Sequence, residues 1–350
     1  MENFENKRRQ QFLSEEYFTS TKNYQTEGVS LYLESDAFED DKYNCGESER
    51  WSGIKDCYWN LLFLEYTAGS SIEQLILLFE QVVNAFDKKA EALAIFEKGK
   101  KPSVIPTQNE TLNIISLAYL LDKEDLLPVI HQLVNGEDQA HINEDEIINK
   151  FFGLNDPEHP IMSEGSLYDL SYSPLCDVID NVKKKNDPKH ALELFDEYLS
   201  SWYKMNKNQT WYNSHLDLEG SVAYSGYWAF EAAALVYLLD LDDSCLHKYL
   251  FYPKDIVQWI RHKRPVHTQN KKTESRYDDV VVHENEKVEV EGYYEDSFTQ
   301  KIIYLTNGDI GPAYPPQQGA NPRVYVWRKL STYGLNQTDS EILRNAKNNF

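Results

Sequence analysis

The stretch GYWAFEAAALVYLLDLDDS, residues 226–244, begins with aromatic side chains, continues as an almost wholly apolar segment and ends in three carboxylates. Apolar residues on every face of a helix predict that the helix is buried on all sides. Glu231 is the one charged residue in the apolar part. A carboxylate there is either held by hydrogen bonds in the core or raised in pKa for use as a general acid. Asp242, Asp243 and Ser244 are predicted to cap the following helix.

The same pattern occurs earlier in the chain. SLAYLLDKEDLL at 116–127 aligns with ALVYLLDLDDSC at 234–245, an offset of 118. LILLFEQVVNAF at 75–86 aligns with ALELFDEYLSSW at 191–202, an offset of 116. Two matches in the same order and at nearly the same spacing indicate a duplicated helical unit.

The fold class that follows is mainly α, with two related α-helical bundle domains and a small C-terminal β appendage. We expect an N-terminal helical domain at 1–160, a C-terminal helical domain at 161–264, and a linker with a small β module at 265–350. Ser71 is predicted to begin one helix, and Asp187 with Pro188 another. Alternating β-branched and aromatic residues after the linker predict three or four short strands, and the last residues a short helix or a frayed tail.

Charge excludes several classes of partner. The chain has 57 acidic and 35 basic residues, a net charge of −22. Such a chain repels nucleic acids and anionic membranes, and a basic protein is its natural complement. The N-terminus has no signal-peptide pattern and no apolar run is long enough to span a membrane, so we expect a cytoplasmic protein. Four scattered cysteines fit reduced thiols and no zinc motif.

Catalytic and cofactor motifs are missing from the sequence. There is no HExxH, no phosphate-binding glycine loop and no nucleophile elbow, so we expect no metal, no cofactor and no enzymatic activity. The sequence instead favours a binding protein. The alternative is a metal-dependent enzyme on a helical scaffold that uses Glu231 with Asp240, Asp242 and Asp243.

The segment from Trp211 to Val257 resembles the C-terminal domain of the bacterial immunity proteins that neutralise polymorphic nuclease (PoNe) toxins, and residues 10–135 resemble their N-terminal domain more loosely. The residues that carry the resemblance are Tyr224, Gly226, Tyr227, Trp228, Glu231, Leu239, Asp242, Asp243, Tyr252, Pro253 and Asp255. Residues 265–350 lie outside this two-domain pattern and look like small tails of other immunity proteins.

The resemblance implies a cytoplasmic antitoxin that occludes the basic cleft of a DNase toxin delivered by a neighbouring cell, often through type VI secretion. The hypothesis is that an acidic and aromatic surface imitates the phosphates of DNA. The residues predicted for this surface are Asp122, Glu124, Asp125, Glu137, Asp138, Asp217, Glu219, Tyr224, Tyr227, Asp240, Asp242 and Asp243.

Overall fold

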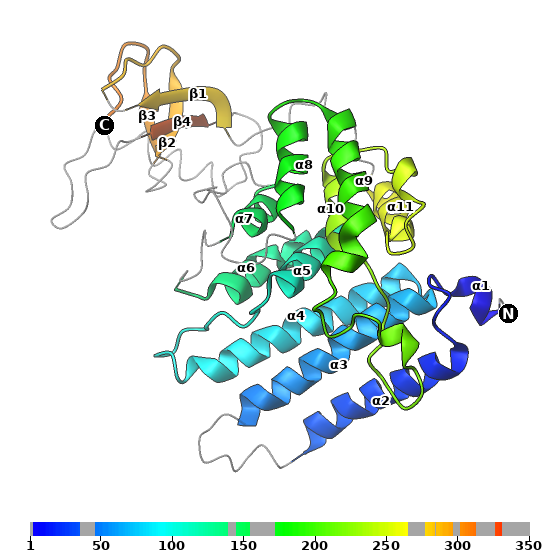
Figure 1. The fold of residues 1–350 in the computed structure, drawn as a ribbon. Helices are drawn as coiled ribbons and strands as arrows, with labels where there is room; N and C mark the ends of the chain where they lie inside the picture. The colour runs from blue at the N-terminus through cyan, green and yellow to red at the C-terminus, as the bar shows by residue number, and fades with distance from the viewer. Residues whose placement is uncertain are drawn as a thin grey trace. The chain divides into compact units, whose positions relative to one another are not determined.

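The chain forms two units, Met1–Val266 and His267–Phe350. The computed structural model describes residues 3–35, 46–138, 145–154, 172–264, 277–283, 285–296, 302–312 and 326–330. The first unit is helical and the second carries strands (Figure 1), which confirms a mainly α protein with a small β appendage. The domain boundaries predicted at 160/161 and 264/265 each adjoin or fall on residues outside the described ranges.

In the described part of the first unit, the helices vary from one turn to six turns in length, and three short 3₁₀ turns (η) separate some of them. In chain order they are α1 (Phe4–Lys7), α2 (Glu15–Glu34), α3 (Gly46–Ala68), α4 (Ile72–Ala94), α5 (Gln108–Leu120), η2 (Glu124–Leu126), α6 (Leu127–Asn135), α7 (Glu146–Phe152), α8 (Ser173–Lys183), α9 (Pro188–Met205), η4 (Ser214–Leu216), α10 (Phe230–Leu238), η5 (Ser244–Leu246) and α11 (Lys254–Lys263).

Two predicted helix starts are confirmed. Ser71 stands at the N-cap position of α4, where its carbonyl oxygen accepts a hydrogen bond from the backbone N–H of Gln74 at 3.1 Å. Asp187 caps α9: its carboxylate accepts from the backbone N–H of His190 at 3.0 Å, and Pro188 occupies the first turn. The Asp187 side chain satisfies a backbone N–H that the helix itself leaves unbonded, whereas the Ser71 side chain makes no such bond.

The core of the first unit runs through both halves of the chain. Helices α2, α3 and α4 pack as successive neighbours, α8 packs against α9, and α5 packs against α10 (Figure 1). Every residue of α10 except Leu238 is buried, as its apolar sequence predicts. One continuous apolar cluster therefore joins the predicted N-terminal and C-terminal parts.

The second unit is a four-stranded antiparallel sheet. Its strands are β1 (Tyr277–His283), β2 (Gly292–Asp296), β3 (Ile302–Leu305) and β4 (Val326–Leu330), in the order β1-β4-β2-β3. Trp327 and Tyr294 are fully buried in a small apolar core of their own. The alternation of apolar and polar residues thus predicts the strands correctly. The predicted terminal helix or tail lies outside the described residues.

Candidate functional site

The aromatic residues that begin the quoted stretch join the two halves of the helical unit, residues 3–154 and residues 172–264. The side-chain amide of Gln10 donates to the carbonyl oxygen of Tyr227 at 2.6 Å. The amide oxygen of Gln10 accepts from the backbone N–H of Tyr227 at 3.0 Å and from the hydroxyl of Tyr224 at 2.8 Å. Tyr224 and Tyr227 are 0% and 4% exposed. They were predicted to contact a toxin, but their burial leaves them almost no surface to offer a partner.

Position 226 must be glycine because the backbone there lies very close to Thr67 of the other half. The hydroxyl of Thr67, on α3, lies 2.6 Å from the carbonyl oxygen of Ser225 and accepts from the indole N–H of Trp228 at 2.8 Å. Gly226 sits between them with φ +114°, and a Cβ at this position would lie 2.0 Å from the Thr67 hydroxyl oxygen. Only glycine combines that backbone conformation with that contact.

Asp255 makes a further contact between the two halves; we call the contacts of Gln10, Gly226 and Asp255 the joint. Its carboxylate pairs with the guanidinium of Arg9, which also donates to the carbonyl oxygen of Tyr66 at 2.5 Å. The backbone N–H of Arg9 donates to the carbonyl oxygen of Thr67 at 2.7 Å. Pro253 stands at the N-cap position of α11. Five of the residues that carry the sequence resemblance therefore connect segments more than 150 residues apart in the chain: Tyr224, Gly226, Tyr227, Trp228 and Asp255.

The acidic ends of α5 and α10 are built alike, at the offset of 118 seen in the sequence. Asp122 and Asp240 both have a left-handed backbone, with φ of 59° and 51°. The residue after each donates its backbone N–H to a carbonyl oxygen in the last turn of the helix. Lys123 donates to Ala118 at 2.8 Å, and Leu241 donates to Val236 at 3.1 Å. This is the same helix-ending motif in both halves, and each is followed by a 3₁₀ turn.

The two acidic ends differ in what they contact. Asp122 is paired with Lys263, at 3.1 Å, and with Arg264 at the end of α11. Glu124 lies 3.5 Å from Arg264. Both carboxylates are partly buried, so their charge is largely used inside the protein. Lys263 and Arg264 are themselves exposed.

Asp243 is also an internal group. It is 4% exposed, accepts from the hydroxyl of Tyr252 at 2.7 Å and pairs with Arg261 at 2.7 Å. Burial alone would raise its pKa, but the hydrogen bonds from Tyr252 and Arg261 hold the pKa of Asp243 below its ordinary value. Asp242 is exposed and accepts from the backbone N–H of Ser244 at 3.0 Å, so the predicted cap is made by Asp242 and not by Asp243.

The other predicted acidic residues remain on the surface. The exposed members of the set are Asp125, Glu137, Asp138, Asp217, Glu219, Asp240 and Asp242. Asp125 lies 3.0 Å from Lys123, and Glu137 accepts from the backbone N–H of Lys101 at 2.9 Å. The remaining five of the twelve predicted residues are buried or half-buried. The acidic surface is therefore smaller than the sequence suggested.

Glu231 is held inside the core. One carboxylate oxygen accepts from the hydroxyl of Tyr198 and from the indole N–H of Trp202, both at 2.7 Å. It is 2% exposed, and burial raises its pKa to about 7. Within the described residues, no three His, Cys, Asp or Glu side chains are grouped as a metal ion requires. Nothing in this arrangement favours the metal-dependent enzyme.

A cleft of about 640 Å³, which the sequence did not predict, lies between the two halves. Its aromatic lining residues are Trp59, Phe63, Trp202, Trp211, Tyr227 and Trp228. Its polar lining includes Asn109, Glu110 and Asn113 of α5. The lining residues lie as far apart in sequence as Gln25 and Trp228, so no local motif could have revealed them. The abundance of tryptophan was the one available signal.

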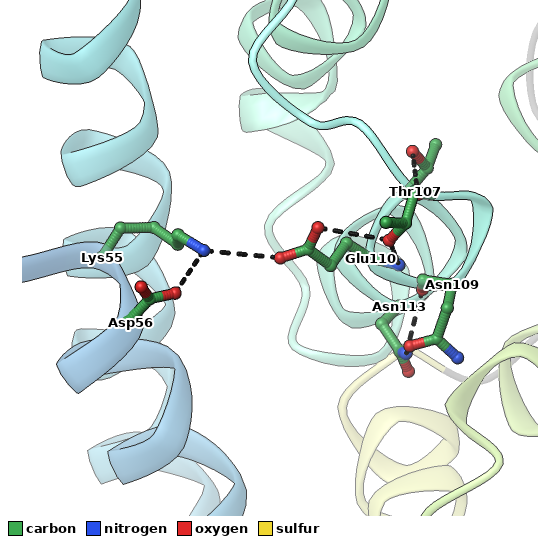
Figure 2. Close-up of polar contacts among 7 residues, drawn as sticks. Lys55, Asp56, Thr107, Asn109, Glu110 and Asn113 are labelled. Carbon is green, nitrogen blue, oxygen red and sulfur yellow. Dashed lines mark hydrogen bonds and ion pairs between the residues drawn. The ribbon is translucent and has the colours of Figure 1, made fainter. Parts of the chain in front are cut away.

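One wall of the cleft carries an ion pair with α3 (Figure 2). Glu110 lies between Lys55 and Thr107: Lys55 Nζ is 3.4 Å from its carboxylate, and the Thr107 hydroxyl is 3.2 Å away. Lys55 is closer to Asp56, at 2.5 Å. Burial alone would lower the pKa of Lys55, but the carboxylates of Glu110 and Asp56 raise it, so Lys55 stays charged.

Known proteins resemble this chain in part of its sequence and in its fold. Residues 143–256 match the family model described as PoNe immunity proteins (PoNi), C-terminal. The crystal structure of protein PA2201 from Pseudomonas aeruginosa has a similar fold, with a TM-score of 0.56 and 15% identity over 73% of this chain and 91% of that chain. No curated protein matches the sequence. Among the described residues, no helix is both long and apolar enough to cross a membrane.

Proposed function

We propose that this chain, whose residues 143–256 match the family model of the PoNe immunity proteins, binds a cognate DNase toxin and neutralises it by occluding the toxin's basic cleft. The match to the immunity family carries the proposal. A toxin of this kind arrives from a neighbouring cell, for example by type VI secretion, and must be bound in the cytoplasm before it cuts DNA.

Electrostatics supports the mechanism. A nuclease needs a basic cleft to hold the phosphates of DNA, and a protein of net charge −22 attracts such a surface over long range. Attraction of this kind accelerates encounter more than it strengthens the final complex. Carboxylates that are exposed and not bound to internal cations contribute most to this field, which favours Asp217, Glu219 and Asp240 over Asp122 and Glu124.

Reversal of charge at Asp217 and Glu219 tests the acidic surface. Both side chains are exposed and follow η4, and neither is described in an ion pair. The double variant Asp217→Lys, Glu219→Lys is expected to weaken binding of the nuclease roughly tenfold, mainly through a slower association rate. The slope of affinity against salt concentration is expected to become shallower. Stopped-flow or surface-plasmon measurements at several salt concentrations give both quantities.

The matched control is Glu289→Lys with Glu291→Lys. These carboxylates are also exposed, and their reversal changes the net charge equally, but they lie in the β unit outside the family match. If the two double variants lose affinity equally, net charge governs binding, and Asp217 and Glu219 do not form a defined contact surface.

The function itself is tested by co-expression. We expect a nuclease domain to be encoded beside this gene, to stop growth and degrade DNA when expressed alone, and to be neutralised when this chain is co-expressed. The purified chain must also form a complex with an active-site variant of that nuclease. Failure of protection together with failure of complex formation would reject the proposed function.

A further inference from the structure

We propose that the cleft between the two halves binds an arginine side chain of the toxin. This inference rests on the proposed function, because it takes a basic protein as the partner. It identifies a contact that does not depend on the exposed carboxylates. The cleft volume of about 640 Å³ is ample for one long side chain.

An unused acceptor lies in the cleft wall. Asn113 is 6% exposed, and its amide nitrogen donates to the carbonyl oxygen and the side-chain oxygen of Asn109, at 3.0 and 3.2 Å. These two acceptors fix which end of the Asn113 amide is nitrogen. Its amide oxygen has no hydrogen-bond partner among the described residues. A buried oxygen without a donor is costly, and a ligand donor that reached it after a small shift of the cleft wall would remove that cost.

The charge of the lining also favours a cation. Glu110 is the one charged residue among those that line the cleft, so no Lys, Arg or His lines it within the described residues. Lys55 neutralises Glu110 only in part, because Lys55 lies closer to Asp56 (Figure 2). A carboxylate offers about four acceptor positions, so Glu110 can accept from a guanidinium in addition to its present partners.

Two backbone N–H groups at the start of α5 are already bonded and do not offer a site for an anion. The backbone N–H of Glu110 already donates to the hydroxyl of Thr107 at 3.2 Å, and that of Thr111 donates to the carbonyl oxygen of Thr107 at 3.0 Å. These two N–H groups of the first turn are therefore unavailable to a phosphate or carboxylate.

Aromatic rings supply the rest of the site. Trp202 and Trp211 are stacked, with ring centroids 5.5 Å apart, and Trp59 lies 5.3 Å from Phe63. The indole N–H of Trp202 is bound to Glu231 and that of Trp228 to Thr67. Trp202 and Trp228 are only 2% and 4% exposed, so the aromatic surface open to a ligand comes from the half-buried Trp59, Phe63 and Trp211. Acceptors beside aromatic faces suit arginine better than lysine, because the planar guanidinium stacks and donates in several directions.

A small-molecule probe tests the cleft without the toxin. N-acetyl-L-arginine amide is titrated into the full chain and followed by tryptophan fluorescence, since four tryptophans line the cleft. Its neutral isostere, N-acetyl-L-citrulline amide, is expected to bind roughly tenfold more weakly, as is N-acetyl-L-lysine amide. Equal binding of the three amides, or no saturable change with arginine amide, overturns the proposal.

Substitutions of cleft residues provide a second test of the proposal. Glu110→Gln retains the shape of the side chain, and Asn113→Ala removes the unused acceptor. Each is expected to weaken both arginine amide and the inactivated nuclease roughly tenfold. The control is Asn181→Ala: Asn181 is equally buried and donates to a carbonyl oxygen four residues earlier, but does not line the cleft. Circular dichroism verifies that each variant is folded.

The outcomes separate this inference from the proposed function. If the wild-type chain binds the nuclease and the cleft variants bind it as tightly as Asn181→Ala does, the cleft proposal is wrong and the immunity function stands. If arginine amide binds in the cleft but the wild-type chain binds no nuclease and gives no protection, the proposed function fails, and so does the assignment of the arginine to a toxin.

Discussion

Replacing Gly226 with alanine is expected to destabilise the protein by about 4 kcal/mol. The new Cβ would lie 2.0 Å from the hydroxyl oxygen of Thr67 and 2.5 Å from the indole nitrogen of Trp228, in a backbone conformation that L residues rarely adopt. Relief of this overlap must break the hydrogen bonds that Thr67 makes with Ser225 and Trp228. The free energy of unfolding measured by urea denaturation checks the result.

Gly220→Ala is the matched control for this change. Gly220 also has a positive φ, +71°, but a Cβ there would meet nothing within 4 Å. Its substitution is expected to cost only the backbone strain of about 1 kcal/mol. If the two alanine variants are equally stable, the close approach of the two halves at Gly226 is not what holds the joint together.

Glu231→Gln is expected to gain stability relative to the wild type as the pH rises. Burial raises the pKa of Glu231 to about 7 in the folded protein, above its ordinary value of 4.5. At a pH between these two pKa values, Glu231 is protonated in the folded protein and ionised in the unfolded chain. The wild type therefore loses stability as the pH rises through this range, by up to about 3 kcal/mol.

Glutamine is neutral at every pH and still offers an oxygen to Tyr198 and Trp202. Its free energy of unfolding, relative to the wild type, is expected to rise by about 2 kcal/mol between roughly pH 5.5 and roughly pH 8. Urea denaturation of both proteins at each pH cancels the titration of all other groups. A difference that does not change with pH would show that Glu231 ionises normally in the folded state.

Glu231→Leu distinguishes the charge from the hydrogen bonds. Leucine removes the ionisable group but leaves the hydroxyl of Tyr198 and the indole N–H of Trp202 without their acceptor. This variant is expected to be less stable than Glu231→Gln at both pH values, by about 2 kcal/mol. Equal stability of the two would mean that the hydrogen bonds to Tyr198 and Trp202 contribute little.

The local features of the fold were predictable from sequence because their causes lie within one or two helical turns. Asp187 marks a helix start because its short polar side chain satisfies an N–H group three residues ahead, and Ser71 stands at the same position of α4 without a side-chain bond. The buried helix at 230–238 follows from apolar residues on all its faces. The similar C-terminal ends of α5 and α10, at Asp122 and Asp240, follow from a sequence pattern that recurs 118 residues later.

The candidate site was predicted less well, because the sequence does not record which polar groups face inward. Tyr224 and Tyr227 look like exposed aromatic residues until Gln10, more than 200 residues away, binds them. Asp243 and Asp242 are adjacent in sequence, yet Arg261 and Tyr252 make the first an interior group and leave the second on the surface. The burial of the two tyrosines and of Asp243 depends on partners that are not their neighbours in sequence.

The sequence by itself determined the mainly α architecture, the helix that runs through the core, the small β unit and the strongly negative charge, since each follows from composition or from periodicity along the chain. Only the tertiary structure decided which carboxylates remain exposed, that Gly226 lies against Thr67, and that a cleft lined by Glu110, Asn113 and tryptophans exists. The physical reason is that burial, close approach and the pairing of charges are set by residues far apart in the chain, which come together only when the two halves pack.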